Sequence, residues 1–553
     1  MSEHDGALSD GALSAPRSPL VTRARDLYRR TVRYLQPNAA LLTLRDALQP
    51  LRGTRPGPGA PVVAVECVED PFYFALFAVV CDQLRATAAT RIELIVVRSV
   101  NGAVGRGAVS RAMRSTLVGR YISRQWTRAF SGLADRVGYR SQSLRHPFAD
   151  LIDWWRSGSI WRRARSDAAG FAQLQVDGIQ VGDLIIDSYL RLAPSARFQP
   201  QDAFVRVLVW QVCRDLRCAR AYFQRRRPLR YLTSYTTYVE HGVAVRVALQ
   251  QGIPVTAFGS LAQFGKSVSR EDWFHTPNAR NYRARFAALD RQDERLAEAD
   301  RQLGMRLGGG IDAATSYMRA SAYRGSAAAV PQVAGATVVF LHDFYDSVHV
   351  YPDLVFDDFW SWVCFTIEAL QAAGAKFFVK PHPNQIEISA QAFTELRQRY
   401  PQLPLIPTGV TNLQLATAGM SCGVTMYGSV AHELAYLGVP SLACARHPHS
   451  SFDFCRTAAS LDEYAQLLRT RDQLPASKAE MRRQALAFFY MQNLYAPADE
   501  LALRGHFRDV WKVCRSVTPR AEELQATLAA LRDAPEFRER VAALRGARGP
   551  DGG

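Results

Sequence analysis

The chain lacks a long uninterrupted apolar segment. Its longest apolar run, Pro71–Cys81, is shorter than the roughly 18 residues that a membrane-spanning helix requires. Residues 1–20 hold acids, Gly, Ser and Pro, without a basic region followed by an apolar one, so we expect a disordered tail and not a signal peptide. These features predict a cytoplasmic protein.

Cysteine is sparse, and its spacing suits neither disulfides nor a metal site. The nine cysteines form no CxxC pair, and several lie in apolar surroundings, among them Cys67, Cys81, Cys364 and Cys444. Scattered cysteines of this kind are typical of buried thiols in a reducing compartment. We therefore expect no disulfide framework and no zinc site.

Lysine is scarce although the chain is strongly basic. Only five of the 68 lysines and arginines are lysine, and the formal net charge is +17. Ten arginines lie between Arg98 and Pro147 against one acid, Asp135, and aromatic residues are interleaved with them. The segment fits an anionic membrane surface, as does the basic helix expected at 21–36, but a solvated helical face is the simpler alternative. No nucleic-acid motif accompanies it, so we expect no nucleic-acid partner.

The order of apolar patterns indicates an α/β protein with more than one domain. A length of 553 residues favours two or three domains. Strand, helix and strand patterns at 61–68, 71–89 and 91–100 indicate a parallel sheet. Strands are expected again at 337–341, 375–380, 403–406, 420–426 and 439–445, with helical patterns between them. We predict a Rossmann-like domain over 21–310 with a basic helical insertion, a second over 336–480, and further helices over 481–546.

Two motifs in the second predicted domain follow strands and precede helices. The first is Lys380-Pro381-His382-Pro383-Asn384, and the second is Tyr427-Gly428-Ser429 with Glu433 four residues further on. In a parallel sheet both would lie at the carboxyl edge, where ligands bind. An imidazole, a Lys charge, a hydroxyl and the free N–H groups of a helix start suit a phosphate. The motifs predict a site for a nucleotide sugar or a similar phosphorylated donor.

Structural explanations for the same residues remain open. His382 could be a packed or helix-capping histidine, and Ser429 could be only an N-cap. Glu433 could bind a donor hydroxyl or make a local bond, and Gly428 would permit a tight turn in either case. His342, with Asp343 and Asp346, follows the first strand of the second domain and could contact a ligand or form a polar turn.

The segments Phe340–Phe359 (FLHDFYDSVHVYPDLVFDDF), KPHP and Tyr427–Pro440 (YGSVAHELAYLGVP) resemble bacterial glycosyltransferases of capsule and surface-polysaccharide biosynthesis. Gly178–Arg191 (GIQVGDLIIDSYLR) is similar to a first-domain element of that group. The group includes Kdo and sialic acid transferases with HP and Ser motifs.

The resemblance implies a GT-B fold, in which two Rossmann-like domains face a central cleft. It implies a nucleotide-sugar donor, plausibly CMP-Kdo or another CMP-sugar, with the phosphate near His382 and Ser429. It also implies a growing polysaccharide or lipid-linked glycan as acceptor, work at the inner membrane, and no metal or other cofactor. The expected donor-binding set is His342, Lys380, His382, Pro383, Tyr427, Gly428, Ser429 and Glu433.

The acceptor side needs a base from the first domain. Asp183 and Asp187 are spaced i,i+4, so on a helix they share a face. Glu240 and His241 lie between a strand and a helix and could act as base or acceptor clamp. We prefer Asp183 because the preceding Gly182 would let an acceptor approach the backbone.

Other functions fit parts of the pattern. The KPHP element is also compatible with a polyol-phosphate transferase that uses CDP-glycerol. A nucleotide-sugar epimerase would share the fold, and a basic scaffold that binds glycans or nucleic acids without catalysis would share the charge.

Overall fold

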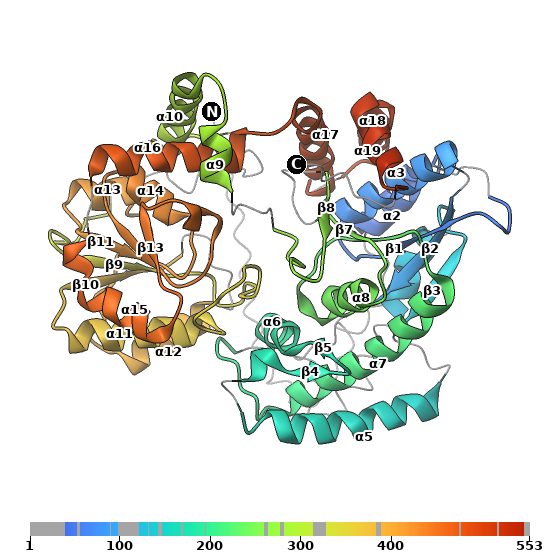
Figure 1. Ribbon diagram of the computed structural model, residues 1–553, viewed down its shortest axis with the longest axis horizontal. Helices are drawn as coiled ribbons and strands as arrows, with labels where there is room; N and C mark the ends of the chain where they lie inside the picture. Colours follow the sequence, from blue (N-terminus) through green and yellow to red (C-terminus); the bar gives the residue numbers. More distant parts are fainter. Residues whose placement is uncertain are drawn as a thin grey trace, which may run out of the picture.

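The computed structural model describes residues 39–51, 56–88, 90–97, 121–130, 132–141, 146–167, 170–193, 195–258, 264–276, 281–312, 328–382, 389–474, 477–516 and 519–546. Two separate mainly parallel sheets organise these residues, each with helices packed around it (Figure 1). The expected tail at 1–20, the basic helix at 21–36 and Pro383 lie outside the described residues.

The first sheet has the strand order β3-β2-β1-β6-β7-β8. Its strands are β1 (Val62–Glu66), β2 (Arg91–Val96), β3 (Arg136–Arg140), β6 (Arg230–Thr233), β7 (Val255–Ala257) and β8 (Lys266–Val268). All neighbours are parallel except β7 and β8. The chain runs outward from β1 to β3 and then returns to place β6 beside β1. Such a reversal is the point at which doubly wound sheets bind ligands.

Helices cover both faces of this sheet. They are α2 (Ala39–Ala47), α3 (Pro71–Ala88), α5 (Pro147–Ala164), α6 (Gly182–Leu192), α7 (Ala203–Arg226) and α8 (Tyr238–Gln250), and a small hairpin, β4 (Gln175–Val176) and β5 (Ile179–Gln180), precedes α6. The long helix α7 starts where the Asp202 side chain accepts from the Phe204 N–H, and ends at Arg227, whose φ is 42°. An aspartate N-cap and a left-handed C-cap are common helix boundaries.

The second sheet is wholly parallel, with the order β10-β9-β11-β12-β13. Its strands are β9 (Thr337–Phe340), β10 (Phe377–Lys380), β11 (Cys422–Val424), β12 (Ser441–Ala443) and β13 (Cys455–Thr457). Its helices are α11 (Phe359–Ala372), α12 (Ser389–Arg399), α13 (Asn412–Thr417), α14 (Val430–Tyr436) and α15 (Leu461–Arg469). The strand predicted at 403–406 is only an isolated bridge between Leu405 and Val379. Pro404 and Pro407 enclose it, and proline cannot donate to a ladder.

The helices that follow the first sheet in the chain are divided between the two domains in a way that the sequence did not predict. Helices α9 (Tyr282–Ala287) and α10 (Gln292–Leu307), expected in the first domain, pack on the second. There Leu303 and Leu307 of α10 meet Leu486 and Phe489, which belong to the apolar face of α16 (Lys478–Phe489). The apolar face of an amphipathic helix decides which domain it joins, and sequence order does not.

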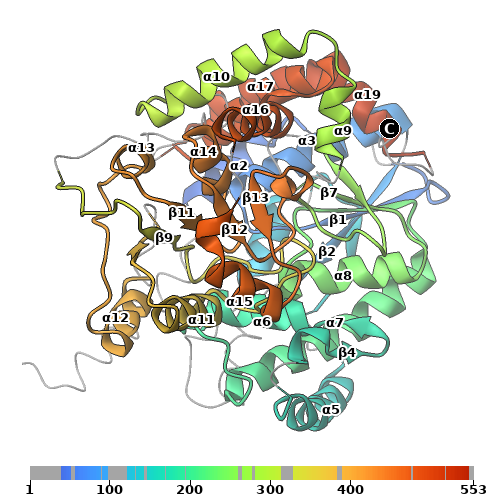
Figure 2. The same ribbon diagram turned by 60° about the vertical axis from the view of Figure 1, so that its left-hand side comes forward.

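The chain then returns to the first domain. Helices α17 (Ala498–Cys514), α18 (Ala521–Asp533) and α19 (Pro535–Ala543) place Phe507 and Leu528 in the same apolar core as Val63. Figure 2 shows α17 and α19 beside the first domain. α18 and α19 are separate helices because Pro535 starts the second one.

The architecture is therefore the predicted GT-B type, two Rossmann-like domains with additional helices. All nine cysteines are free and eight are buried, which confirms the expectation of buried thiols. Within the described part of the chain, we find no helix with both the length and the apolar character needed to cross a membrane.

Candidate functional site

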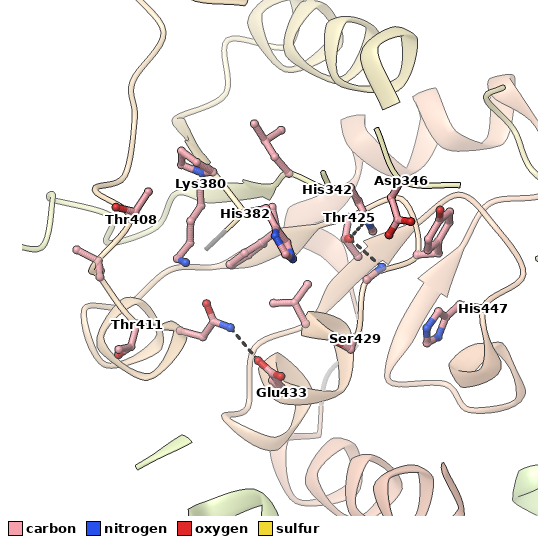
Figure 3. Close-up of a pocket in the computed structure, with 18 of the residues that line it drawn as sticks. His342, Asp346, Lys380, His382, Thr408, Thr411, Thr425, Ser429, Glu433 and His447 are labelled. Atoms are coloured by element: carbon pink, nitrogen blue, oxygen red, sulfur yellow. Dashed lines mark hydrogen bonds between the residues drawn. The ribbon is translucent and has the colours of Figure 1, made fainter. Parts of the chain in front are cut away.

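A cavity of about 350 Å³ opens at the carboxyl ends of β9, β10 and β11 (Figure 3). It lies where the strand order of the second sheet reverses, between β9 and β11. The predicted donor-binding residues that the structure describes all line it. The polar and aromatic lining residues are His342, Asp346, Ser347, Tyr351, Lys380, His382, Thr408, Thr411, Asn412, Thr425, Tyr427, Ser429, Glu433 and His447.

Lys380 brings a positive charge into this cavity. It is 6% exposed, and its ammonium has no hydrogen-bond or ion-pair partner within 4 Å among the described residues. Burial lowers the pKa of Lys380, and the negative charge of Glu433 opposes that effect. A buried ammonium without such a partner gains most from an anionic ligand.

His342 supports the loop that carries the Ser motif. Its Nε2 lies 3.0 Å from the Thr425 hydroxyl, which also accepts from the Gly428 N–H at 3.0 Å. The ring stacks on Phe359 with centroids 4.6 Å apart. Burial, with the neighbouring charge of His382, lowers the pKa of His342 to about 3. A neutral His342 therefore holds Thr425, a residue that the sequence analysis missed.

Gly428 is required for this contact. A Cβ at Gly428 would lie 2.7 Å from the Thr425 hydroxyl oxygen and 3.5 Å from the His342 ring. The glycine thus serves a close approach between side chain and backbone. A larger residue would push the loop away from β9.

Ser429 does not act as an ordinary N-cap. Its backbone is already helical, with φ −59° and ψ −17°, and its side chain makes no capping hydrogen bond. The residue is exposed and lines the cavity. The side chain therefore does not cap the helix, and a ligand contact by Ser429 stays a prediction.

Glu433 is held by neighbouring side chains. It is 1% exposed and accepts a hydrogen bond from Asn412 Nδ2 at 2.9 Å (Figure 3). It also lies 3.7 Å from a guanidinium nitrogen of Arg306. Asn412 begins α13 directly after a capping box formed by Thr411 and Gln414. That capping pattern was visible in the sequence and could have placed Asn412 at a helix start.

His382 is half-buried beside the Lys380 side of the cavity. Burial lowers its pKa, the negative charge of Asp343 raises it, and the charge of Lys380 lowers it further. Burial therefore favours the neutral imidazole, and an anionic ligand would favour its protonation.

The segment His447-Pro448-His449 places neutral histidines at and behind one side of the cavity. His447 lies 4.1 Å from His449 and 5.0 Å from Tyr351, measured between ring centroids. Burial and the neighbouring histidines hold the pKa of His447 well below its usual range. The described residues contain no group of three or more His, Cys, Asp or Glu placed to hold a metal ion.

A second polar cluster occupies the corresponding place in the first sheet. Glu66 ends β1, and its carboxylate accepts from the Ser234 N–H at 2.7 Å, the Ser234 hydroxyl at 2.6 Å and the Thr233 hydroxyl at 3.2 Å. Its other oxygen bonds to Nδ1 of His241. The Nε2 of His241 faces Glu240 at 3.3 Å. The sequence analysis missed Glu66, because only the adjacency of β1 and β6 brings it to His241.

The charges around His241 keep its ring protonated. Burial lowers the pKa of His241, but the negative charges of Glu66 and Glu240 outweigh burial and raise it to about 10. Gly242 lets helix α8 lie this close, since a Cβ there would meet Leu184 at 2.4 Å. The cluster is an imidazolium between two carboxylates, of which Glu240 is the more exposed.

Asp183 does not face an acceptor. Both of its carboxylate oxygens bond to the guanidinium of Arg246, one of them at 2.7 Å, and the residue is 5% exposed. Gly182 is needed because a Cβ there would lie 1.8 Å from the Phe171 carbonyl oxygen. The glycine thus serves packing, and this geometry argues against the preference for Asp183 as the base.

Asp187 connects the two domains. It accepts from the Ser347 hydroxyl at 2.6 Å, from the Val348 N–H at 3.2 Å and from the backbone N–H of His349 at 3.3 Å. It also lies 2.8 Å from His349 Nδ1. Burial lowers the pKa of His349, but Asp187 outweighs burial and raises it to about 10. Asp187 is fully occupied as a bridge to the loop that forms one wall of the cavity.

Arg191 of α6 and Tyr238 of α8 pair with each other in the first domain. The Arg191 guanidinium donates to the Tyr238 hydroxyl at 2.9 Å and lies over its ring. Burial raises the pKa of Asp346, which lines the cavity, and the charge of Arg191 opposes that rise, so the two side chains are near one another. The charge of Glu240 acts on Arg191 in turn. Arg191 is thus influenced electrostatically by acids of both domains, Glu240 and Asp346.

No family model and no curated protein matches the chain. Solved structures do match it. The beta Kdo 2,4 transferase KpsC of Thermosulfurimonas dismutans is 11% identical, with a TM-score of 0.27 over 47% of this chain and 79% of that one. The UDP-GlcNAc 2-epimerase of Neisseria meningitidis is 11% identical, with a TM-score of 0.26 over 77% and 94%. The glycotransferase of kitacinnamycin is 12% identical, with a TM-score of 0.19 over 88% and 95%. Scores of this size assign no activity.

Proposed function

We propose that the protein is a glycosyltransferase that moves a sugar from a nucleotide donor to a growing surface or capsular polysaccharide. The observation that carries the proposal is the pair of polar clusters at corresponding points of two Rossmann-like sheets. One cluster is an open cavity that contains the ammonium of Lys380. The other is the imidazole of His241 between the carboxylates of Glu66 and Glu240.

In this proposal the second-domain cavity binds the donor. The Lys380 ammonium and the Ser429 hydroxyl meet the phosphate, with His382 beside them. As the bond between sugar and phosphate breaks, the nucleotide leaves with the electron pair, and these groups stabilise its negative charge. The donor we propose is a CMP-sugar such as CMP-Kdo, and this choice rests on the motif resemblance alone.

The first-domain cluster supplies proton transfer. The acceptor hydroxyl forms the new glycosidic bond, and its proton passes to the Glu240 carboxylate, which His241 orients from its other side. A protonated His241 has no lone pair to offer, so the raised pKa directs the base role to Glu240. Asp183 and Asp187 act as structural groups in this scheme.

The test is product analysis with purified protein and a panel of donors that includes CMP-Kdo, a UDP-sugar and CDP-glycerol. Mass spectrometry of an added glycan acceptor should show the mass of one transferred sugar together with free nucleotide. A donor converted to an isomer without acceptor would identify an epimerase. Transfer of a polyol phosphate would identify the CDP-glycerol alternative, and no turnover of any donor would favour the scaffold.

We also propose that the protein works in the cytoplasm at the inner membrane, where lipid-linked acceptors are found. The basic segment at 98–147 supported this expectation. Of its ten arginines, Arg136 pairs with Glu93 and Arg140 donates to Ser123 and Thr127. Arg124 and Arg128 are exposed, and the other six arginines lie outside the described residues, so the role of this segment stays a proposal.

A further inference from the structure

The most exposed large apolar side chains of the described residues all lie on helix α5. Phe148 is 82% exposed, Trp155 71%, Ile152 66% and Leu151 53%, and no other such side chain exceeds 48%. Their spacing places them on one face of the helix, over a length of about 10 Å. A contiguous exposed apolar patch usually marks a contact surface.

The opposite face of α5 is firmly packed. Trp154 lies edge-on to Trp210 of α7, with centroids 5.7 Å apart, and the Trp161 Nε1–H donates to the Pro200 carbonyl at 2.8 Å. Asp150 and Asp153 both pair with Arg217. The helix is therefore fixed in orientation, and its outer face is presented by the fold.

The outer face carries positive charge and no acid of its own. Both acids of α5 face inward to Arg217, whereas Arg162 and Arg163 are exposed on the last turn. Neither arginine has an acidic partner within 4 Å among the described residues; they bond instead to the Gly158 carbonyl and the Ser159 hydroxyl. The face thus combines an apolar first half with a basic second half.

We infer that the outer face of α5 docks on an anionic lipid surface, with Phe148, Ile152 and Trp155 inserted and Arg162 and Arg163 at the phosphates. The helix lies at the edge of the molecule (Figures 1 and 2), where a flat surface can reach it. Amphipathic helices that lie in the membrane interface combine these residue types, and aromatic side chains favour that depth. The inference does not rest on the proposed catalytic activity.

The test uses the full-length protein and two kinds of vesicle, phosphatidylglycerol mixed with phosphatidylcholine, and phosphatidylcholine alone. The double variant Phe148→Ser/Trp155→Ser should bind the anionic vesicles about tenfold more weakly than the unaltered protein in sedimentation assays. The matched control Leu413→Ser/Leu501→Ser removes exposed apolar side chains elsewhere and should bind as the unaltered protein does. Circular dichroism and thermal unfolding check that both variants fold.

A second pair of variants separates charge from insertion. Arg162→Gln/Arg163→Gln should weaken binding by about fivefold or more and make it less sensitive to salt. Trp155→Phe should keep binding but lose part of the fluorescence quenching by brominated lipid.

Three results would overturn the inference. Full vesicle binding by the Phe148→Ser/Trp155→Ser variant would assign the contact to other basic segments. Absence of vesicle binding by the unaltered protein would exclude the lipid surface. Loss of a dimer in that variant, with vesicle binding unchanged, would identify the face as an interface between two copies.

Discussion

Each domain carries a histidine near the point where its strand order reverses, and the two histidines have opposite charge states. In the first domain His241 lies between Glu66 and Glu240, which raise its pKa to about 10. In the second domain His342 stacks on Phe359, and burial with the His382 charge lowers its pKa to about 3. The histidine near the reversal of the strand order is therefore charged in the first domain and neutral in the second.

The different charge states suit the two clusters to different steps of the proposed reaction. Carboxylates around an imidazolium suit proton transfer and repel phosphate, so the first cluster is the acceptor side of the proposed reaction. Neutral imidazoles and an ammonium without a partner among the described residues suit an anion, so we propose the second cavity as the donor side. Asp187 ties the two together through His349.

The largest expected effect on kcat comes from substitutions in the first-domain cluster. Glu240→Gln and His241→Gln should each lower kcat about 10²–10⁴-fold, the range for lost acid–base help, while donor affinity stays the same. The control is His506→Gln, on α17 and outside both clusters. Steady-state kinetics and donor titration check this, and an equal loss of donor affinity would contradict it.

The next largest effect is expected from a substitution in the second-domain cavity. Lys380→Met removes the ammonium but keeps the apolar stem, so kcat/KM should fall about 10²–10³-fold as phosphate stabilisation is lost. Lys376→Met is a matched control, because Lys376 is exposed and donates only to the Ala334 carbonyl. Equal activity of the two variants would remove Lys380 from the donor site.

A third prediction separates structural acids from catalytic ones. Asp183→Asn leaves Arg246 buried without its partner, so the free energy of unfolding should fall by about 3 kcal/mol, with kcat per folded molecule unchanged. Asp187→Asn should lower stability similarly and also reduce kcat, because it loosens the cavity wall at Ser347. Denaturant unfolding and kinetics measure both, and a hundredfold lower kcat in Asp183→Asn would restore that residue as the base.

The smallest expected effect is on the stability of the second domain at low pH. His449 has a folded-state pKa of about 3, lowered from 6.5 by burial, so the unfolded chain binds more protons below pH 6.5. Its stabilising contribution is present above that pH and is lost as the pH falls, by at most about 1.4 kcal/mol per pH unit. The second domain should therefore unfold more easily at pH 5 than at pH 7, and His449→Phe should reduce this sensitivity in urea titrations. His241 behaves oppositely, since its contribution is lost as the pH rises toward 10.

The sequence predicted β1 and β2 of the first sheet, β9 to β12 of the second and the residues that line the cavity, since buried parallel strands are short apolar runs and the motifs directly follow them. It did not predict β3, which lies in the basic segment expected to be helical, and the donor role of the cavity stays a prediction. It could place Asp183 and Asp187 on one helix face but not say that the face points inward, which depends on Arg246 and His349. Glu66 depended on a strand pairing across more than 160 residues. The exposed face of α5 reads in sequence like any amphipathic helix, and only packing shows which side is covered.

Titration calorimetry with free CMP tests the central claim most directly, using the unaltered protein, Lys380→Met and His241→Gln. If the second-domain cavity holds the donor nucleotide, the unaltered protein and His241→Gln should bind CMP with the same affinity, and Lys380→Met should bind it far more weakly. Loss of CMP binding in His241→Gln, with Lys380→Met unaffected, would place the nucleotide in the first domain and contradict the account.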